Sequence, residues 1–384
     1  MALSGKARAV HFALGAALVM SAVPGVLRAQ VAASDPPIVV HGKVSSRESG
    51  APLAGALVTL EDSTGVARLR VVTSPSGAYS IPAPSAGRWR LRVAAIGYDP
   101  SPARSFTLTL MGDQVVDVVM IRRPFQLPTL VVRGKGEKCF PDPVGDPIVT
   151  RLVGEAETAL QLVEASIASH RLEFVTEAWQ SRALLGSADT LRGFGRSQAR
   201  ASWPIASTDL ELLRTGGFVR DTGGRPPSQG YSRDSGPIYY GPDASVLFSP
   251  WFRAQHCFAL DQRAGGDSLV VRYTPKSLAK GRVDVEGALV LDRTTLALRR
   301  LVFRYVGLPG WVPRQRAGGE VSFLRLSTGL WAANSWQMRA PIQLWRRWGT
   351  GGLTLGGWAE MGGRVVEMWE AGVRERRPLA DGPA

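Results

Sequence analysis

The stretch VVHGKVSSRESGAPLAGALVTLEDS, residues 39–63, decides the fold of the first part of the chain. Two short apolar runs flank a segment rich in Gly, Ser and Pro, which are residues that favour turns. Short strand-like runs continue to residue 122, with a turn about every eight to twelve positions. Strands this short and this closely spaced predict a β-sandwich, and we expect about seven strands in residues 36–122.

One predicted strand, residues 87–94, displays both of its faces. Side chains alternate along a strand, so Trp89, Leu91 and Val93 lie on one side and predict the core. The opposite side carries Arg88, Arg90 and Arg92. These arginines form either a solvated face or a binding site for an anionic partner.

Four motifs follow one another in this segment. They are V-x-G-x-V at residues 40–44, P-L-x-G-A-x-V at 52–58, S-G-x-Y-x-I at 76–81 and I-G-Y at 96–98. In this order they resemble the carboxypeptidase regulatory-like domain, a transthyretin-like sandwich related to carbohydrate-binding-like folds. The resemblance covers under a quarter of the chain. It implies a non-catalytic module of the kind found at the start of bacterial envelope proteins.

Residues 1–33 are typical of a secretory signal peptide. Lys6 and Arg8 supply a basic start, an apolar run covers residues 12–23, and small residues follow Pro24-Gly25. The apolar run is shorter than the ~20 residues of a spanning helix, so we expect cleavage rather than anchoring. The expected location is the periplasm or the outer membrane, with no transmembrane span after cleavage.

The chain has two cysteines, Cys139 and Cys257. An oxidising compartment favours a disulfide between them. Such a bridge would close a long loop and stabilise the protein by ~4–5 kcal/mol in the entropic treatment. The alternative is two buried thiols that do not meet, because a bridge depends on the distance between the two Cα atoms.

The formal net charge is +14, and it falls to +11 once the signal segment with Lys6, Arg8 and Arg28 is removed. Strong basicity often indicates a nucleic-acid partner. An exported protein rarely meets nucleic acid, and the basic residues form no dense run, so we expect none. Anionic envelope polymers, lipid head groups or acidic proteins fit such a charge, and a spread of solvated arginines is the simpler interpretation.

A Pro-rich linker is expected over residues 123–146, followed by an amphipathic helix over 147–170. Asp146 is suited to the N-cap and Pro147 to the first helical position. Apolar residues at helical spacing form the buried stripe of this helix: Ile148, Leu152, Ala156, Ala159, Val163 and Ile167.

Residues 171–370 are predicted to form an antiparallel β domain, and residues 371–384 a flexible tail. The segment 283–306 is similar to the curved sheets of periplasmic lipoprotein carriers. The fold class is therefore mainly β, with a seven-stranded sandwich, one amphipathic helix and an antiparallel sheet domain. Aromatic residues of this domain either line a ligand site or close the core: Tyr239, Tyr240, Trp251, Trp331 and Trp336, with Trp345, Trp348 and Trp358 nearby.

His170 and Glu173 form an H-x-x-E motif, the spacing with which zinc carboxypeptidases hold their metal. A zinc enzyme also needs a third ligand and a general base. His41 lies in the sandwich motif, and His256 lies in a predicted strand beside a cysteine. We therefore expect no catalytic residue, no metal and no cofactor.

The acidic residues Asp284 and Glu286 share one face of a predicted strand. Alternating acids on an exposed face are common, so we interpret this pair as solvated surface.

Together these observations favour a non-catalytic exported envelope protein with a binding or scaffolding role. The expected ligand is a polysaccharide, a lipid or an outer-membrane protein partner. Two alternatives stay open. One is a zinc-dependent hydrolase or peptidase that uses His170, Glu173 and His256, and the other is a periplasmic lipid or lipoprotein carrier with an apolar cavity behind its Trp-rich strands.

Overall fold

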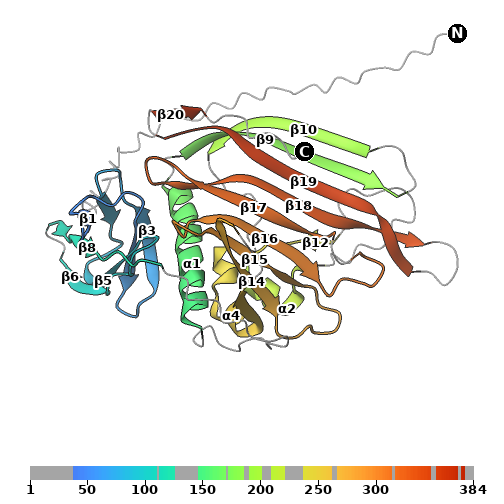
Figure 1. Ribbon diagram of the computed structural model, residues 1–384, viewed down its shortest axis with the longest axis horizontal. Coiled ribbons are helices and arrows are strands. Elements are labelled where there is room, and N and C mark those ends of the chain that lie inside the picture. The colour runs from blue at the N-terminus through green and yellow to red at the C-terminus, as the bar shows by residue number, and fades with distance from the viewer. Residues whose placement is uncertain are drawn as a thin grey trace, which may run out of the picture. The chain divides into compact units, whose positions relative to one another are not determined.

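The chain clusters into two units, residues 1–37 and residues 38–384. The computed structural model describes parts of the second unit, whose elements are drawn in Figure 1: residues 38–109, 112–125, 146–169, 172–185, 190–200, 209–220, 237–261, 266–313, 316–346, 352–370 and 373–376. The predicted signal peptide lies outside these residues, and so do most of the predicted linker and C-terminal tail.

The first part of the described chain is a β-sandwich of two four-stranded sheets. One sheet has the order β4-β1-β7 with β8 also paired to β1, and the other has the order β3-β2-β5-β6. The strands are β1 Val39–Ser46, β2 Leu57–Asp62, β3 Ala67–Val72, β4 Ala78–Pro82, β5 Gly87–Ala94, β6 Arg104–Leu108, β7 Gln114–Val115 and β8 Val118–Met120. The sandwich is confirmed, and it has eight strands instead of seven because the two-residue β7 precedes β8.

The predicted core face of β5 is confirmed. Trp89, Leu91 and Val93 are at most 7% exposed and pack with apolar residues from both sheets. The strand pairs with β2 on one side and β6 on the other, so its backbone hydrogen bonds are satisfied along both edges. The arginine side of β5 therefore faces away from the sandwich core.

Helix α1 spans Pro147–Ala168 and begins where the sequence predicts. The Asp146 carboxylate accepts hydrogen bonds from the backbone N–H groups of Ile148 and Val149, at 2.9 and 3.3 Å. The helix ends two residues before the predicted position, with Ser169 as its C-cap. The predicted stripe is confirmed, since its four central members are at most 1% exposed and both ends pack against the same core.

The second part is a ten-stranded sheet with the order β10-β9-β19-β18-β17-β16-β15-β14-β13, in which β20 also pairs with β19. Its strands are β9 Leu172–Leu184, β10 Thr190–Arg200, β13 His256–Leu260, β14 Ser268–Pro275, β15 Asp284–Asp292, β16 Leu298–Val306, β17 Gly318–Arg325, β18 Trp331–Arg346, β19 Gly352–Glu370 and β20 Val373–Arg376. Strands β14 to β19 are neighbours in chain order, so the predicted antiparallel meander is confirmed. The hairpin of β9 and β10 extends the sheet beyond β19.

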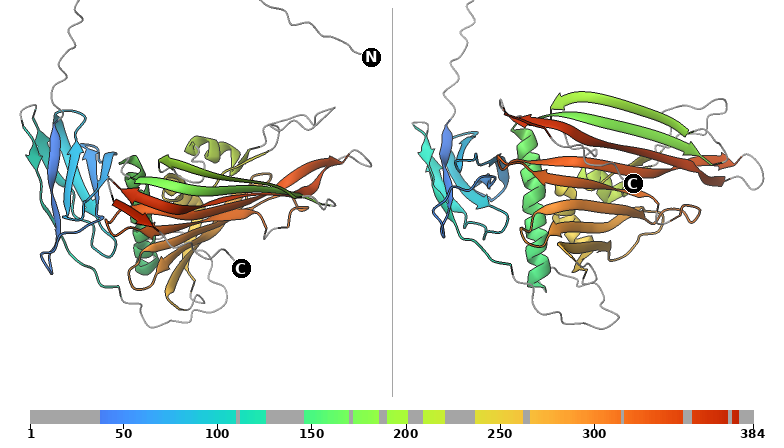
Figure 2. Two further views of the ribbon diagram at one scale, coloured as in Figure 1. Left: turned by 90° about the horizontal axis from the view of Figure 1, so that it is seen from above. Right: turned by 45° about the horizontal axis from the view of Figure 1, so that its top comes forward.

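Three short helices and a separate two-stranded pair accompany this sheet. They are α2 Leu210–Gly216, α3 Ala244–Leu247, α4 Pro250–Gln255, β11 Val219–Arg220 and β12 Ile238–Tyr239. The sequence predicts one helix, which is α1. The three short helices do not show the pattern that predicts α1, because each is no longer than two turns. Figure 2 shows helix α1 running across the strands of the sheet near one end of them.

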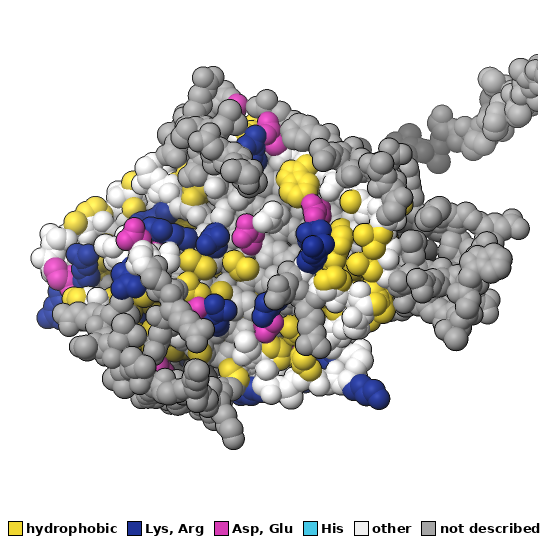
Figure 3. Space-filling view, turned by 45° about the vertical axis from the view of Figure 1, so that its right-hand side comes forward, with side chains coloured by type: hydrophobic (Ala, Val, Ile, Leu, Met, Phe, Trp, Pro, Cys, Tyr) yellow, Lys and Arg dark blue, Asp and Glu magenta, His cyan; other side chains and the backbone are white. Residues whose placement is uncertain are grey.

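The two faces of the large sheet differ in chemistry. On β16, Leu301, Phe303 and Tyr305 point into the core and are at most 2% exposed. The other face carries ion pairs between neighbouring strands: Arg304 with Glu286, Arg300 with Glu320 at 3.8 Å, Arg339 with Glu360 at 3.0 Å and Arg364 with Glu177 at 2.9 Å. Figure 3 shows one side of the molecule on which Lys and Arg side chains lie beside Asp and Glu side chains. Many arginines are thus matched locally, which supports a distributed charge.

The sandwich packs on helix α1. Leu57 and Val72 of the sandwich belong to the same buried cluster as the helix stripe. The backbone N–H of Gly97, in the predicted I-G-Y motif, donates to a carboxylate oxygen of Glu155 at 3.0 Å. Arg325 donates to the Ala54 carbonyl at 2.7 Å from the large sheet. The sandwich therefore has a core of its own and contacts the rest of the unit through Leu57, Val72 and these hydrogen bonds.

Replacing either of two glycines in this unit by alanine should change the free energy of unfolding, in opposite directions. A Cβ at Gly287, on β15, would overlap the Val302 carbonyl oxygen and lie 2.5 Å from the Tyr273 hydroxyl, whereas a Cβ at Gly154, within α1, meets nothing within 4 Å. Gly287→Ala is expected to lower the free energy of unfolding by about 1–3 kcal/mol through overpacking. Gly154→Ala should raise it by about 0.5–1 kcal/mol because alanine favours helix. Urea titration checks both, and equal effects would contradict the packing described.

Glu155 is expected to make the stability of the fold depend on pH. Burial raises the pKa of its carboxyl, and the hydrogen bond from Gly97 and the charge of Arg151 offset that shift only in part. A carboxyl with a raised folded-state pKa stabilises the fold below its ordinary value of 4.5 and loses that contribution as the pH rises through the folded-state pKa. Wild type should therefore lose stability relative to Glu155→Gln between pH 4 and pH 7. Urea titration at several pH values checks this, and a constant difference would show that Glu155 does not titrate in this range.

Candidate functional site

Two of the three predicted arginines on β5 are held by a buried acid. The Nε atoms of Arg90 and Arg92 lie 3.9 and 3.0 Å from the carboxylate oxygens of Glu61, whose side chain is 8% exposed. Arg88 is exposed. A buried carboxylate needs such partners, so Arg90 and Arg92 have a structural role whether or not an anionic partner binds there.

The tryptophans of the large sheet differ in exposure. Trp331 is 2% exposed, and its backbone N–H donates to the Ser166 hydroxyl of α1 at 3.0 Å. Trp358 is 5% exposed beneath the Arg339 guanidinium, and the partly buried Trp336 lies across Gly363. Trp331 therefore fills the core, whereas Trp358 is buried beneath Arg339 on the sheet face that carries the Arg339–Glu360 ion pair. Trp348 and the side chain of Trp345 lie outside the described residues.

Tyr239 and Tyr240 close the inner side of the sheet. Both are partly buried, and the ring of Tyr239 meets that of Tyr305 edge to face at 5.3 Å. The Tyr305 hydroxyl donates to the Tyr240 carbonyl at 2.9 Å. These contacts attach β12 to β16 and give the two tyrosines a packing role.

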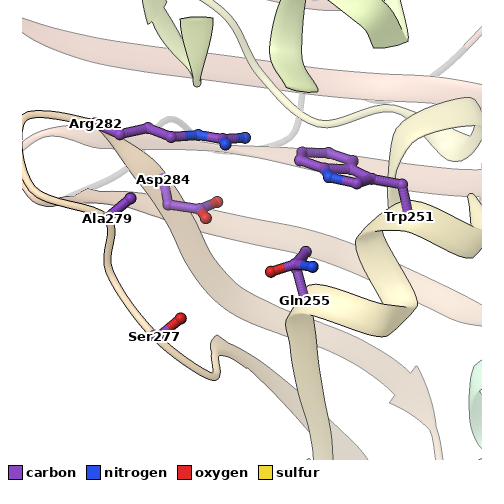
Figure 4. Close-up of a pocket in the computed structure, with 6 residues that line it drawn as sticks. All are labelled: Trp251, Gln255, Ser277, Ala279, Arg282 and Asp284. Atoms are coloured by element: carbon purple, nitrogen blue, oxygen red, sulfur yellow. The ribbon is translucent and has the colours of Figure 1, made fainter. Parts of the chain in front are cut away.

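Trp251 is the predicted residue that borders a pocket. The pocket is a small, partly open hollow of about 60 Å³, lined by Trp251, Gln255, Ser277, Ala279, Arg282 and Asp284. Figure 4 shows Trp251 and Gln255 on α4, facing Asp284 at the start of β15 and Arg282 two residues before it. Ser277 and Ala279 lie on the connection between β14 and β15.

Helix α4 divides its side chains between the pocket and the core. Ser249 caps the helix, its hydroxyl accepting from the Phe252 N–H at 3.0 Å, and Pro250 starts it. Trp251 and Gln255 are four residues apart and share the face that lines the pocket. Phe252 and His256 have the same spacing and face the core, where their rings stack at 3.6 Å between centroids.

Asp284 forms the polar floor of the pocket. Its Oδ1 atom accepts from the Val285 N–H at 2.8 Å and lies 3.2 Å from His256 Nε2. Among the described residues, none donates a hydrogen bond to Oδ2. The sequence-based interpretation of Asp284 as solvated surface is wrong, because only 13% of its side chain is exposed and a buried imidazole holds it.

Arg282 forms the wall beside Asp284. One terminal nitrogen donates to the Leu213 carbonyl of α2 at 2.9 Å, and the guanidinium carbon lies 5.6 Å from the centroid of Trp251. The Nε–H group is buried and meets no acceptor in the part of the chain that the structure describes. The pocket thus combines an aromatic wall with a cationic donor and an anionic acceptor.

His256, the proposed third zinc ligand, is fully engaged by the protein. Its side chain is 0% exposed, Nδ1 lies 3.1 Å from the Phe252 carbonyl oxygen, and Nε2 lies 3.1 Å from that of Val285. His170 and the side chain of Glu173 lie outside the described residues. Within the described ranges, no three His, Cys, Asp or Glu side chains gather in a way that could hold a metal.

Sequence reasoning identified Trp251 but missed the rest of the pocket lining. The position of Gln255 beside Trp251 could have been predicted, since it lies four residues later on a segment that begins with Ser-Pro. The positions of Arg282 and Asp284 could not be predicted in this way. The pairing of β13 with β14 and of β14 with β15 brings these two residues opposite α4.

Comparison with known proteins identifies the first part of the chain. The family of carboxypeptidase regulatory-like domains matches residues 39–121. These residues form a carboxypeptidase regulatory-like domain. The match ends at the last strand of the sandwich, so the carboxypeptidase regulatory-like domain excludes helix α1, the large sheet and the pocket. A search of curated proteins found no match.

Solved structures that match parts of this chain include three bacterial proteins. The 5-hydroxyisourate hydrolase of Klebsiella pneumoniae is 14% identical, and the match covers 23% of this chain and 92% of that one, with a TM-score of 0.20. A DUF3823 family protein of Bacteroides ovatus is 9% identical over 43% and 81%, with a TM-score of 0.19. The major pilin subunit of Bacillus cereus is 9% identical over 90% and 97%, with a TM-score of 0.21. At such TM-scores none of the three supports a functional inference.

Within the described part of the chain, no helix has both the length and the apolar character needed to span a bilayer.

Cys257 lies beside His256 on β13. It is 4% exposed and disulfide-bonded. Cys139, its predicted partner, lies outside the described residues.

A reductant should test this bridge directly. If Cys139 and Cys257 are joined, reduction is expected to lower the free energy of unfolding by as much as ~4–5 kcal/mol, because the unfolded chain regains the freedom of a long loop. Urea titration with and without dithiothreitol measures the change. Cys139→Ser should be unstable to the same degree and insensitive to dithiothreitol, and an unaffected wild type would contradict the bridge.

Proposed function

We propose that this chain is a non-catalytic, exported protein of the bacterial envelope that binds an envelope component in the Trp251 pocket. The observation that carries the proposal is the set of polar groups around that pocket without protein partners. Asp284 and Arg282 both line the hollow. Oδ2 of Asp284 and the buried Nε of Arg282 have no hydrogen-bond partner among the described residues. Partly desolvated polar groups are costly unless something binds them.

A binding role fits this pocket better than catalysis. Nucleophilic catalysis requires a hydroxyl or thiol within hydrogen-bond reach of a base. Ser277 is the hydroxyl of the pocket lining, and His256, the nearby imidazole, is directed to Phe252, Val285 and Asp284. The same contacts disfavour a zinc hydrolase, because a metal ligand needs a ring nitrogen with an available lone pair.

The lipid-carrier alternative receives little support from the large sheet. Such a carrier requires an apolar cavity behind the Trp-rich strands. Trp331 and Trp358 instead belong to the cluster of buried residues, together with the stripe of helix α1. A buried Trp331 occupies space that an acyl chain behind these strands would need.

Export is supported by the sequence and by the chemistry of Cys257. The first 33 residues have the charge, apolar run and small residues of a signal peptide. A disulfide at Cys257 fits an oxidising compartment. The carboxypeptidase regulatory-like domain packs on α1 through Leu57 and Val72 and would act as part of the binding protein.

Co-sedimentation with envelope material tests the proposal. The complete chain is produced in a Gram-negative host, where we expect periplasmic protein whose mass lacks residues 1 to about 29–33. This mature protein should pellet with isolated cell envelopes, and Trp251→Ala should reduce the pelleted fraction several-fold by removing the wall of the pocket.

Trp179→Ala is the matched control, because Trp179 is 37% exposed and lies over Gly362, away from the pocket. It should pellet like wild type. Unprocessed cytoplasmic protein, or equal pelleting of wild type and Trp251→Ala, would refute the proposed function.

A further inference from the structure

The outer face of the sandwich sheet β3-β2-β5-β6 gathers arginines from two strands. Arg92 of β5 and Arg70 of β3 both lie opposite Thr59 of β2, so the three side chains share a face. Residues two apart on one strand also share a face, which adds two more members. We propose that this arginine face docks onto a membrane surface that contains anionic lipid, where its guanidinium groups bind the lipid phosphates. The arginine face consists of Arg70, Arg88, Arg90 and Arg92.

One buried acid serves two of these arginines. The Glu61 carboxylate lies 3.0 Å from Arg92 Nε and 3.9 Å from Arg90 Nε, and the Glu61 side chain is 8% exposed. Because a carboxylate carries a single charge, one positive charge of this group has no counterion within it. The side chains of Arg90 and Arg92 are 34% and 48% exposed, so both guanidinium groups can also donate to an anion from solvent.

Arg88 lies among donors at the edge of the sheet. It is exposed and forms no ion pair with any residue that the structure describes. On the neighbouring strand β6, Thr107 lies opposite Arg88 and Ser105 opposite Arg90, and both hydroxyl residues are exposed. Guanidinium and hydroxyl groups on one face are suited to the oxygen atoms of a phosphate, which accept several hydrogen bonds.

The charges on and beside this face do not cancel among the described residues. Arg70 lies near Glu164 of α1. Burial and the nearby Asp243 raise the pKa of the Glu164 carboxyl, and the charge of Arg70 offsets part of that shift. Four arginines thus meet two acids, Glu61 and Glu164, and an excess of two positive charges remains. Such an excess attracts an anionic partner.

The arginines are arranged in a plane instead of a line. Strands β3 and β5 lie on either side of β2, so the backbones of Arg70 and Arg92 are about 10 Å apart, which is two strand spacings. Arg88, Arg90 and Arg92 extend over about 13 Å along β5. A single polymer chain follows one line and reaches one row of these groups, whereas a membrane presents phosphates in two dimensions. The planar arrangement therefore favours a lipid surface.

An exposed apolar residue borders the arginine face. Val66 is 50% exposed and lies in the turn between β2 and β3. The Arg90 guanidinium reaches this turn, since one of its terminal nitrogens would lie 3.2 Å from a Cβ added at Gly65. Membrane-surface binding combines electrostatic attraction to anionic lipid with apolar side chains that enter the headgroup region. A soluble anionic polymer gains nothing from Val66, so this feature also favours lipid.

Vesicle co-sedimentation tests the proposal on the mature protein. The probes are vesicles of phosphatidylcholine alone, vesicles of an equal mixture of phosphatidylcholine and phosphatidylglycerol, and soluble alginate as an anionic polysaccharide. We expect binding to the mixed vesicles that added salt abolishes, because salt screens the charges. Arg88→Ala should weaken this binding about fivefold, as expected for one arginine at an anionic surface. Arg88→Lys keeps the charge and should retain most of the binding.

Matched variants separate docking from a general loss of charge and from unfolding. Arg220→Ala removes the same charge from an exposed position on β11, outside the sandwich, and should bind the mixed vesicles as wild type does. Trp251→Ala should also bind them as wild type does, because the pocket lies outside the sandwich. Circular dichroism melting confirms that each variant is folded. If Arg88→Ala does not fold, Val66→Ser decides the matter, and it should weaken binding severalfold.

The remaining outcomes are distinct. Equal binding to neutral and mixed vesicles, no binding to either, or binding that Arg88→Ala leaves unchanged overturns the proposal. Binding to alginate but not to vesicles replaces the lipid by an anionic polysaccharide and overturns it as well. Vesicle binding that requires Trp251 instead of Arg88 assigns the lipid to the pocket, which refutes docking by the arginine face and supports the proposed function.

Discussion

The burial of helix α1 on two sides is the constraint on which the rest of the structure depends. Its stripe packs into the same cluster as the inner face of the large sheet, and Leu57 and Val72 of the sandwich join that cluster. One 22-residue helix thus connects two β layers that would otherwise each expose an apolar face. Glu155 accepts the Gly97 N–H where the sandwich meets the helix, so a carboxylate is buried as the cost of that junction.

Part of the strongly basic composition of the chain lies on the outer face of the large sheet. Arginines on its outer face lie opposite acids on neighbouring strands, as Arg339 does with Glu360 and Arg364 with Glu177. Each such surface pair contributes only ~0–1 kcal/mol to stability, and each neutralises one arginine charge locally. In the sandwich, Arg90 and Arg92 likewise lie against an acid, Glu61. Among the described residues, these arginines are therefore paired with acids from neighbouring strands.

The sequence predicted those parts of the fold whose information is local. The alternation around Trp89 predicted a buried strand face, and Asp146-Pro147 predicted the start of α1. The pocket could not be predicted in this way. Asp284 begins β15 and Arg282 lies two residues before it, whereas Trp251 and Gln255 come from a helix of six residues. The two segments approach each other because of strand pairings that neither segment encodes alone. The role of Trp331 could not be predicted either, because a sequence does not show whether an aromatic residue lines a groove or fills a core.

The candidate site and the core are coupled through one short segment. On α4 and the residue that follows it, Trp251 and Gln255 face the pocket while Phe252 and His256 face the interior. The buried imidazole lies against Oδ1 of Asp284, which leaves Oδ2 as the carboxylate oxygen without a described donor. A side chain fixed from behind loses little conformational freedom when a ligand binds, which favours affinity. The orientation of the site therefore depends on the packing of Phe252 and His256, residues that a ligand in the pocket need not touch.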